Sequence, residues 1–378
     1  MSQMPCLEVT EMIDDMGGAE MYKCCQCGTC TALCPWGPLT GYSNRKLNMM
    51  AQLGIEGVEE IMWECSTCKL CVERCPKGVD GIELVQAIRR IYASEGLLPE
   101  TLRIVAGSLK ADGNPWSGER DKRTAWAEGL ELPAYEGQEY GWFPCCTISY
   151  DPRNKAVGQA QAKLLKAMGL DFGAFGNEMS CCGEAIDKIG DDEVTEALRD
   201  ANTELFTSTG VGKLLVSSPH CLATFQHDYD VDSMQVEHMV QLLAAKLADG
   251  TLTPTTDLGG VKVTYHDPCY MGRHSQVYDD PRQVLAALPG VEVVEMPRNR
   301  NNSYCCGGGG GKMWVEVAKG ERPSDNRVLE AKSTGATILA TACPYCISMF
   351  EDAVGTLELE GQIRVVAISE LVAEACGL

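Results

Sequence analysis

The sequence predicts an α + α/β protein in which a helical domain is followed by two copies of a small α/β domain. Three observations support this prediction. Residues 1–93 combine many cysteines with apolar residues spaced three to four apart, as in helices. Farther along the chain, short β-rich runs alternate with amphipathic stretches. A group of cysteines also recurs there 123 to 125 residues later, and this nearly constant offset indicates a duplicated unit.

The composition excludes several classes of protein. The chain has 378 residues, 45% of them hydrophobic, which is enough for two or three packed domains. Its formal net charge of -21 would repel nucleic acids and anionic lipid headgroups. Because several of the 21 cysteines are adjacent pairs, metal ligation is favoured over disulfides. The acidic N-terminal segment, and the lack of a run of about 18 apolar residues, predict a cytoplasmic protein that reaches a membrane only through a partner subunit.

The chain divides into four segments. A helical domain at 1–93 precedes an irregular linker at 94–141, which is rich in Gly, Pro, Trp and charge. Two α/β domains follow at 142–258 and 259–378, each expected to contain a mainly parallel sheet covered by helices. The expected strands are 213–218, 261–266, 291–296 and 336–342. The expected helices are 42–53, 58–62, 82–93, 155–168, 192–209, 235–247, 281–288 and 324–332.

Two cysteine motifs of identical spacing lie in the helical domain, 41 residues apart, and each ends in Cys-Pro. This is the pattern of two-cluster ferredoxins, in which three thiolates of one motif and the last thiolate of the other hold each cluster. Zinc is the alternative for Cys-x-x-Cys pairs, but the doubled motif favours two [4Fe-4S] cubanes. The domain is therefore a helical di-cluster ferredoxin domain. One cluster is assigned to Cys24, Cys27, Cys30 and Cys75, and the other to Cys65, Cys68, Cys71 and Cys34. Plain thiols are expected at Cys6, Cys25 and Cys376.

The duplicated unit carries a second kind of cysteine pattern. In the second copy, five thiolates would converge at the carboxyl ends of parallel strands. Five thiolates are more than a cubane uses as ligands, and the adjacent pair of cysteines could bridge irons. A larger or opened cluster is therefore expected. These cysteines are Cys269, Cys305, Cys306, Cys343 and Cys346.

The first copy lacks one of these cysteines, because Ser218 stands where the second copy has Cys343. Its remaining ligands are Cys146, Cys181, Cys182 and Cys221, with Cys145 as a fifth candidate. Zinc, a cubane, an open cluster and an empty vestigial site all remain open here. His220 could supply the missing ligand, although helix capping or packing explains it equally well.

The spacing of the second copy, in which about 35 residues separate Cys, Cys-Cys-Gly and Cys-x-x-Cys, resembles the duplicated cysteine-rich (CCG) domain of heterodisulfide reductases. With the double ferredoxin motif, the resemblance covers nearly the whole chain and is greatest to the D subunit of these enzymes. The family also includes the iron–sulfur subunit of glycolate oxidase. The resemblance implies a noncubane [4Fe-4S] cluster at which a disulfide is split. The implied catalytic residues are Cys269, Cys305, Cys306, Cys343 and Cys346. It extends only in part to the first copy.

Other residues near the second copy are also candidates for function. The run Gly307–Gly311 before Lys312 is not a phosphate loop, because Cys306 and Met313 occupy positions that need Gly and Ser or Thr. These glycines are expected to let the backbone approach a cluster, donate N–H groups to sulfur and leave room for a substrate. Proton delivery to a departing thiolate has four candidates, for each of which packing or surface charge is the commoner role: His266, His274, Arg273 and Lys312.

These patterns predict an oxidoreductase subunit of an anaerobic redox complex. Electrons would pass through the two cubanes to the noncubane cluster, which would reduce a disulfide. The sequence has no nucleotide-binding glycine fingerprint, so a flavoprotein or membrane-bound redox subunit is expected as partner. One alternative is a non-catalytic subunit that passes electrons between a flavoprotein dehydrogenase and a quinone-reactive membrane subunit. The dehydrogenase would act on a hydroxyacid or on an electron-transfer flavoprotein. Another alternative is a scaffold whose C-terminal sites hold zinc. Nucleic acid and a direct membrane span are not expected.

Overall fold

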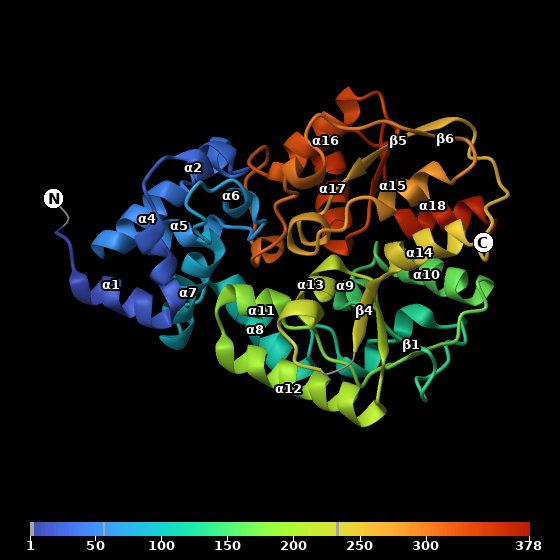
Figure 1. The fold of residues 1–378 in the computed structure, drawn as a ribbon, viewed down its shortest axis with the longest axis horizontal. Coiled ribbons are helices and arrows are strands. Elements are labelled where there is room, and N and C mark those ends of the chain that lie inside the picture. The colour runs from blue at the N-terminus through green and yellow to red at the C-terminus, as the bar shows by residue number, and fades with distance from the viewer. Residues whose placement is uncertain (1–3, 56, 232–233) are drawn as a thin grey trace.

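A computed structural model describes residues 4–55, 57–231 and 234–378. The helical domain lies on one side of the molecule, against two α/β domains that are stacked on each other (Figure 1). This arrangement confirms the predicted α + α/β class, with a parallel sheet in each of the two later domains. Among the helices of the described ranges, none combines the length and apolar character needed to cross a lipid bilayer.

The helical domain is built around α4 and α7. The side chain of Ser43 caps α4 by accepting a hydrogen bond from the backbone of Lys46, and Asp80 caps α7 in the same way. Both helices bury apolar faces that include Leu47 and Leu84. The helices of this domain are α1 Leu7–Ile13, α2 Thr29–Leu33, α3 Gly37–Thr40, α4 Asn44–Leu53, α5 Val58–Ile61, α6 Leu70–Glu73 and α7 Gly81–Ser94.

The segment between the domains corrects the prediction of an irregular linker at 94–141. Helix α8, Glu100–Asp112, occupies part of it and ends at Gly113, which has a left-handed conformation. Its face at Leu102, Val105 and Leu109 packs into the core of the α/β domains. The prediction was wrong because the Gly- and Trp-rich stretch after this helix dominated the composition, although the three apolar residues have helical spacing.

The first α/β domain contains a parallel sheet of order β2-β1-β3-β4. The expected helix at 235–247 begins with a strand, because Gln235–His238 pairs with the neighbouring strand and only then turns into a helix. The strands are β1 Tyr140–Phe143, β2 Phe172–Ala174, β3 Lys213–Val216 and β4 Gln235–His238. The helices are α9 Cys146–Tyr150, α10 Lys155–Ala167, α11 Glu184–Ile189, α12 Asp192–Thr209, α13 Pro219–His227 and α14 Met239–Ala248.

The second α/β domain repeats this topology, with a parallel sheet of order β6-β5-β7-β8. The identical strand order in both domains shows that the recurrence of cysteines reflects a duplicated fold. The strands are β5 Val261–His266, β6 Val291–Val293, β7 Ile338–Thr341 and β8 Arg364–Ala367. The helices are α15 Asp280–Ala286, α16 Pro323–Ser333, α17 Pro344–Thr356 and α18 Ile368–Ala375.

The two α/β domains pack reciprocally. Helix α10 contacts α18, and α14 contacts α15, which is the equivalent of α10 in the second domain. Such reciprocal contacts indicate approximate twofold symmetry. Arg153 ties the domains together through ion pairs of 2.7 Å to Glu351 and 2.8 Å to Glu370. One continuous apolar core extends through both domains.

Candidate iron–sulfur sites

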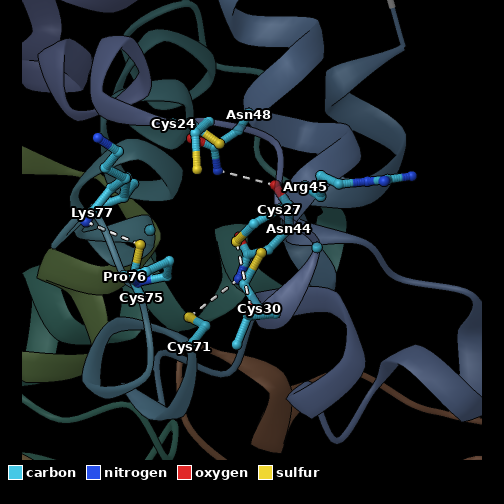
Figure 2. Close-up of a pocket in the computed structure, with 15 residues that line it drawn as sticks. Cys24, Cys27, Cys30, Asn44, Arg45, Asn48, Cys71, Cys75, Pro76 and Lys77 are labelled. Atoms are coloured by element: carbon cyan, nitrogen blue, oxygen red, sulfur yellow. Dashed lines mark hydrogen bonds between the residues drawn. The ribbon is translucent and has the colours of Figure 1, made fainter.

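The helical domain brings its eight motif cysteines together in two groups. Figure 2 shows the thiols of the first group pointing toward a shared space, with Cys71 beside them. We call this group the first ferredoxin site; it contains Cys24, Cys27, Cys30 and Cys75. The second ferredoxin site surrounds an adjacent cavity and contains Cys34, Cys65, Cys68 and Cys71. Cys71 lines both cavities, so the two sites are neighbours. Cys75 lies with the first three cysteines of the first motif and Cys34 with those of the second, while Cys25 also lines the first cavity. The assignment of cluster ligands stays a prediction.

The backbone of the two motifs turns in the same way. Gln26 and Gly28 in the first motif have positive φ angles of 58° and 82°, and Thr67 and Lys69 occupy the equivalent positions at 50° and 64°. Left-handed residues at these positions bend the chain into a tight loop, which lets three thiols point to one side.

The groups around these thiols suit iron–sulfur clusters. Val79 donates its backbone N–H to Cys75 Sγ at 3.3 Å, and the Asn44 side chain donates to Cys71 Sγ at 3.3 Å. Such N–H donors stabilise sulfur that carries negative charge, as cluster ligands do. Within the described residues, no two cysteines form a disulfide. The donor set therefore fits two clusters.

The two ferredoxin sites differ in depth. Cys27 of the first site is exposed, whereas Cys65 of the second site is only 7% exposed. The second site faces the second α/β domain, because Arg273 donates to the Cys68 carbonyl at 2.6 Å and Tyr304 donates to the Pro35 carbonyl at 2.9 Å. The helical domain thus presents one site toward solvent and the other toward the interior.

Three of the predicted cysteines of the second α/β domain lie just after the carboxyl ends of two neighbouring strands, where an open parallel sheet places its ligands, and Cys305 and Cys306 lie in the loop after β6. Cys269 follows β5, and Cys343 follows β7 as the N-cap of α17. The thiols of Cys306 and Cys346 are 3.4 Å apart. All five predicted thiols of this group, the second α/β site, are buried: Cys269, Cys305, Cys306, Cys343 and Cys346.

The second α/β site touches the second ferredoxin site directly. The thiol of Cys305 lies next to those of Cys269 and Cys68 and raises the pKa of both. Ser66 Oγ lies 3.6 Å from Cys305 Sγ. Cys68, Cys269, Cys305 and Tyr270 also share one small apolar cluster. Thiols of two domains are therefore neighbours without an intervening side chain.

The glycine run after Cys306 forms this junction. Gly307 donates its backbone N–H to Cys305 Sγ at 3.3 Å, as expected for glycines beside a cluster. A Cβ atom on Gly309 or Gly310 would lie 2.5 Å from the carbonyl oxygen of Ser66 or Cys65, respectively. The expected room for a substrate at these two glycines is therefore filled by the backbone of the second ferredoxin motif, and that part of the prediction was wrong.

The first α/β domain also gathers its predicted cysteines around one cavity. This first α/β site comprises Cys145, Cys146, Cys181, Cys182 and Cys221. Ser218 lines the same cavity, and its hydroxyl caps α13 by accepting from the backbone of His220. Arg123, which no sequence motif had singled out, donates to Cys146 Sγ at 3.3 Å. In the sequence, Arg123 is only a charged residue in a segment without regular apolar spacing. Its contact with Cys146 could therefore not be predicted.

The acidity of the thiols differs between the two α/β sites. Burial raises the pKa of Cys145 to about 12. In the second site, hydrogen bonds from Cys305 and Cys346 lower the pKa of Cys306. Burial acts to raise the pKa of Cys343, but hydrogen bonds from Cys346 and His220 outweigh it and lower that pKa. The pKa values of Cys269 and Cys346 in the same site are raised, by a hydrogen bond with Cys305 and by burial respectively, so the second site contains both acidic and weakly acidic thiols.

His220 reaches from the first α/β domain into the second α/β site. Its Nδ1 atom lies 2.9 Å from Glu184 Oε2, and its ring also forms a hydrogen bond with Cys343. The ring stacks on Tyr270 with centroids 3.9 Å apart. His220 therefore lies between the two α/β sites: it contacts the second and also lines the cavity of the first, where it stays a candidate for the ligand that Ser218 replaces.

Three of the four candidates for proton delivery hold the domains together. Arg273 donates to the carbonyl oxygens of Cys68 and Ser303. His274 Nε2 is 3.0 Å from the Thr67 carbonyl oxygen. Lys312 pairs with Glu64 at 3.3 Å. The bond from Arg273 to Ser303 fixes Arg273 within the second α/β domain. The other contacts join that domain to the ferredoxin domain.

Comparisons with known proteins match both parts of the chain. The family described as "4Fe-4S dicluster domain" matches residues 20–79, and the family described as "Cysteine-rich domain" matches residues 140–226 and 263–351. The chain is 30% identical to the D subunit of the dihydromethanophenazine:CoB–CoM heterodisulfide reductase of Methanosarcina barkeri, and the alignment covers 95% of each chain.

Two longer proteins are also similar. The chain is 32% identical to the EtfAB:quinone oxidoreductase of Syntrophomonas wolfei over 84% of its own length and 46% of that protein. It is 28% identical to the probable iron–sulfur-binding oxidoreductase FadF of Bacillus subtilis over 94% of its own length and 60% of that protein. The chain thus spans about half the length of these two curated relatives. With a dicluster domain, two cysteine-rich domains and a full-length match to a heterodisulfide reductase protein, the chain belongs to the iron–sulfur oxidoreductase family that includes the D subunit of heterodisulfide reductase.

Proposed function

We propose that this chain is a subunit of an anaerobic redox complex in which electrons pass through two [4Fe-4S] cubanes to a noncubane [4Fe-4S] cluster that reduces a disulfide. The observation that carries this proposal is the contact between the thiols of Cys68 and Cys305. It joins the second ferredoxin site to the second α/β site with no intervening residue.

The order of the sites gives the path a direction in space. The first ferredoxin site includes the exposed Cys27 and is where a partner would exchange electrons. Cys71 lies between the two ferredoxin sites, and Cys305 lies at the next junction. The second α/β site is the most deeply buried of the three, which suits the end of a path.

The ligands of the second α/β site would hold a cluster of unusual form. Five thiolates exceed the four that a cubane uses, and Cys305-Cys306 is suited to bridging irons. When bound, such a cluster supplies one-electron reduction and an iron position that can bind a substrate sulfur. Cleavage of the S–S bond then consumes two electrons, taken one at a time, and two protons, and yields two thiols.

The occupant of the first α/β site is part of the proposal. Its cysteines and Arg123 favour a further cluster or a zinc ion. Iron and zinc analysis of anaerobically assembled protein separates the options. About sixteen iron atoms per chain would support a further cluster here, about twelve with zinc would support a zinc ion here, and about eight with zinc would support a scaffold role for both α/β domains.

The partner is proposed to be a flavoprotein or a membrane-bound redox subunit. With a flavoprotein this chain would lie in the cytoplasm, and with a membrane-bound subunit it would lie at the cytoplasmic face of the membrane. The names of the relatives support this, since one is an EtfAB:quinone oxidoreductase and another is called a probable membrane-anchored ferredoxin. Purification of the native complex identifies the partner by mass spectrometry.

The Cys306→Ser variant tests the assignment of the second α/β site. We expect loss of its electron paramagnetic resonance (EPR) signal and at least a hundredfold loss of disulfide reduction with a reduced viologen as donor, while both cubane signals remain. Cys376→Ser, at a half-buried thiol outside all sites, is the matched control and should retain both properties. Unchanged turnover with the signal lost would end this assignment.

A second candidate function is electron transfer without catalysis, between a flavoprotein dehydrogenase and a quinone-reactive membrane subunit. The burial of all five thiols of the second α/β site favours it, as does the similarity to the quinone oxidoreductase. The two functions separate in the purified complex. A conducting subunit has reducible clusters, supports quinone reduction with its partners and reduces no disulfide.

A further inference from the structure

His266 faces the second α/β site. It ends β5, three residues before Cys269, and its side chain is buried, with 1% exposure. One ring nitrogen lies within 4.8 Å of the sulfur atoms of Cys306 and Cys346. The ring also packs edge-on against Phe350, with centroids 4.7 Å apart, which holds its plane in place.

Arg327 fixes the protonation of this ring. Its Nε atom donates to His266 Nδ1 at 3.1 Å. A guanidinium has only donors and keeps its charge, so Nδ1 must be the acceptor. The proton of the neutral imidazole then lies on Nε2.

The position of Arg327 is itself determined by its other bonds. It is fully buried, donates to the Arg298 carbonyl oxygen and to Glu330 at 2.8 Å each, and donates to Ser303 Oγ at 3.2 Å. With all three nitrogens engaged, the guanidinium has no freedom to turn away from His266.

The remaining N–H group of His266 lacks a partner. Nε2 is buried and makes no hydrogen bond to any described residue. A buried donor without an acceptor costs about 1–3 kcal/mol, so such a group normally has one. The sulfur atoms of Cys306 and Cys346, which can accept a hydrogen bond, lie within 4.8 Å of a ring nitrogen.

We propose that the Nε2–H group of His266 donates a hydrogen bond to sulfur at Cys306 or Cys346 when the second α/β site holds its cluster. His266 is then a positioning residue that stabilises the reduced, more negative state, and neither an iron ligand nor a proton donor. The inference rests on the proposed function in requiring a cluster at this site. An N–H···S bond withdraws charge from sulfur, so it raises the reduction potential.

The first α/β domain provides an internal comparison. The residue three positions before Cys146 is Phe143, which is buried and lines the first α/β site. Phenylalanine has no N–H to donate. The first copy therefore lacks both this donor and the fifth cysteine, which Ser218 replaces. The two features are present together in the second copy and absent together in the first.

The test compares His266→Phe, which introduces the residue of the first copy, with His266→Gln, which retains an N–H donor. EPR-monitored redox titration of the anaerobically assembled full chain measures the midpoint potential of each cluster. We expect a more negative potential for the second α/β cluster in His266→Phe, return toward the wild-type value in His266→Gln, and unchanged cubane potentials and iron content in both. An unchanged potential in His266→Phe would overturn the inference.

Wild-type protein with isotope-labelled histidine gives a second measurement, which serves even if His266→Phe does not fold. Electron–nuclear double resonance should show a weak nitrogen coupling to the second α/β cluster that persists in His220→Gln, since His220 also reaches this site at Cys343. A strong coupling, as for a nitrogen bound to iron, or no coupling at all would overturn the inference. If the proposed function is wrong, the wild-type chain lacks this cluster's signal altogether, which distinguishes that outcome from failure of the inference alone. The inference would then be overturned as well.

Discussion

Two glycines set the distance between the ferredoxin domain and the second α/β domain. Gly309 and Gly310 lie in the loop after Cys306, where a Cβ on either would come within 2.5 Å of a carbonyl oxygen of the second ferredoxin motif. Gly310 also has a φ of +60°, which a side chain would disfavour. Because Cys305 meets Cys68 at the same junction, the absence of these two side chains permits the contact between the two sites.

The Gly310→Ala variant tests this close approach. The added methyl group would force the loop away from Cys65, so we expect loss of about 2–4 kcal/mol of stability and a weaker signal from the second α/β cluster. Anaerobic denaturant titration and EPR measure the two effects. Gly335→Ala is the control, because Gly335 has a φ of +78° and no atom within 4 Å of its added Cβ, so only about 1–2 kcal/mol of backbone strain should appear. Equal losses in the two variants would contradict the clash.

Among the elements, α7 connects all three domains through one buried side chain. Arg89 is fully buried and donates to the carbonyl oxygens of Met62 and Cys65 in its own domain. It also donates to Lys188 in the first α/β domain and to Gly310 in the second. Burial lowers the pKa of this guanidinium, but four carbonyl acceptors compensate for the loss of water.

Replacing Arg89 with Met should destabilise the docking of all three domains. Arg89→Met leaves four buried carbonyl groups without their donor, so we expect a loss of about 3 kcal/mol or more, measured by denaturant titration. The adjacent Arg90→Met is the matched control. Arg90 is partly exposed and pairs with Asp192 at 3.1 Å, so its loss should cost about 1 kcal/mol or less. Comparable losses in the two variants would contradict a joining role for Arg89.

At the scale of the whole molecule, two of the candidate metal sites meet at a contact between domains. The second ferredoxin site meets the second α/β site at Cys305, and His220 of the first α/β domain reaches Cys343 of the second. The α/β domains share one large apolar core, whereas the ferredoxin domain has a smaller core of its own. The ferredoxin domain should therefore depend more on its clusters for stability.

Removal of iron tests this dependence. After chelation under reducing conditions, we expect the ferredoxin domain to open and residues 1–93 to become sensitive to protease, because a small core without its clusters is only marginally stable. The segment from about residue 140 onward should survive as a fragment, identified by mass spectrometry. The untreated holoprotein is the control. Simultaneous digestion of both parts would show that the α/β domains need metal as well.

Much of the fold could be predicted because it depends on local patterns. The strands at 261–266 and 336–342 and the helices at 192–209 and 324–332 follow from β-rich runs and helical spacing. The errors arose where other segments of the protein, and not the local residues, determine the secondary structure. Residues 235–238 form a strand only because β3 is available as a partner, and α8 adjoins a Gly- and Trp-rich segment that hid its apolar face.

The spacing of the cysteines predicts which of them lie near one another, since ligands of a shared site recur at intervals that the chain geometry imposes. Contacts between residues far apart in the sequence were not predictable, whether they lie within one domain or join two. Nothing near Arg327 indicates that it would bond to His266, and nothing near Gly310 indicates the backbone of Cys65 against it. Burial and packing bring these groups together, so their roles follow from the folded chain and cannot be found in any one segment.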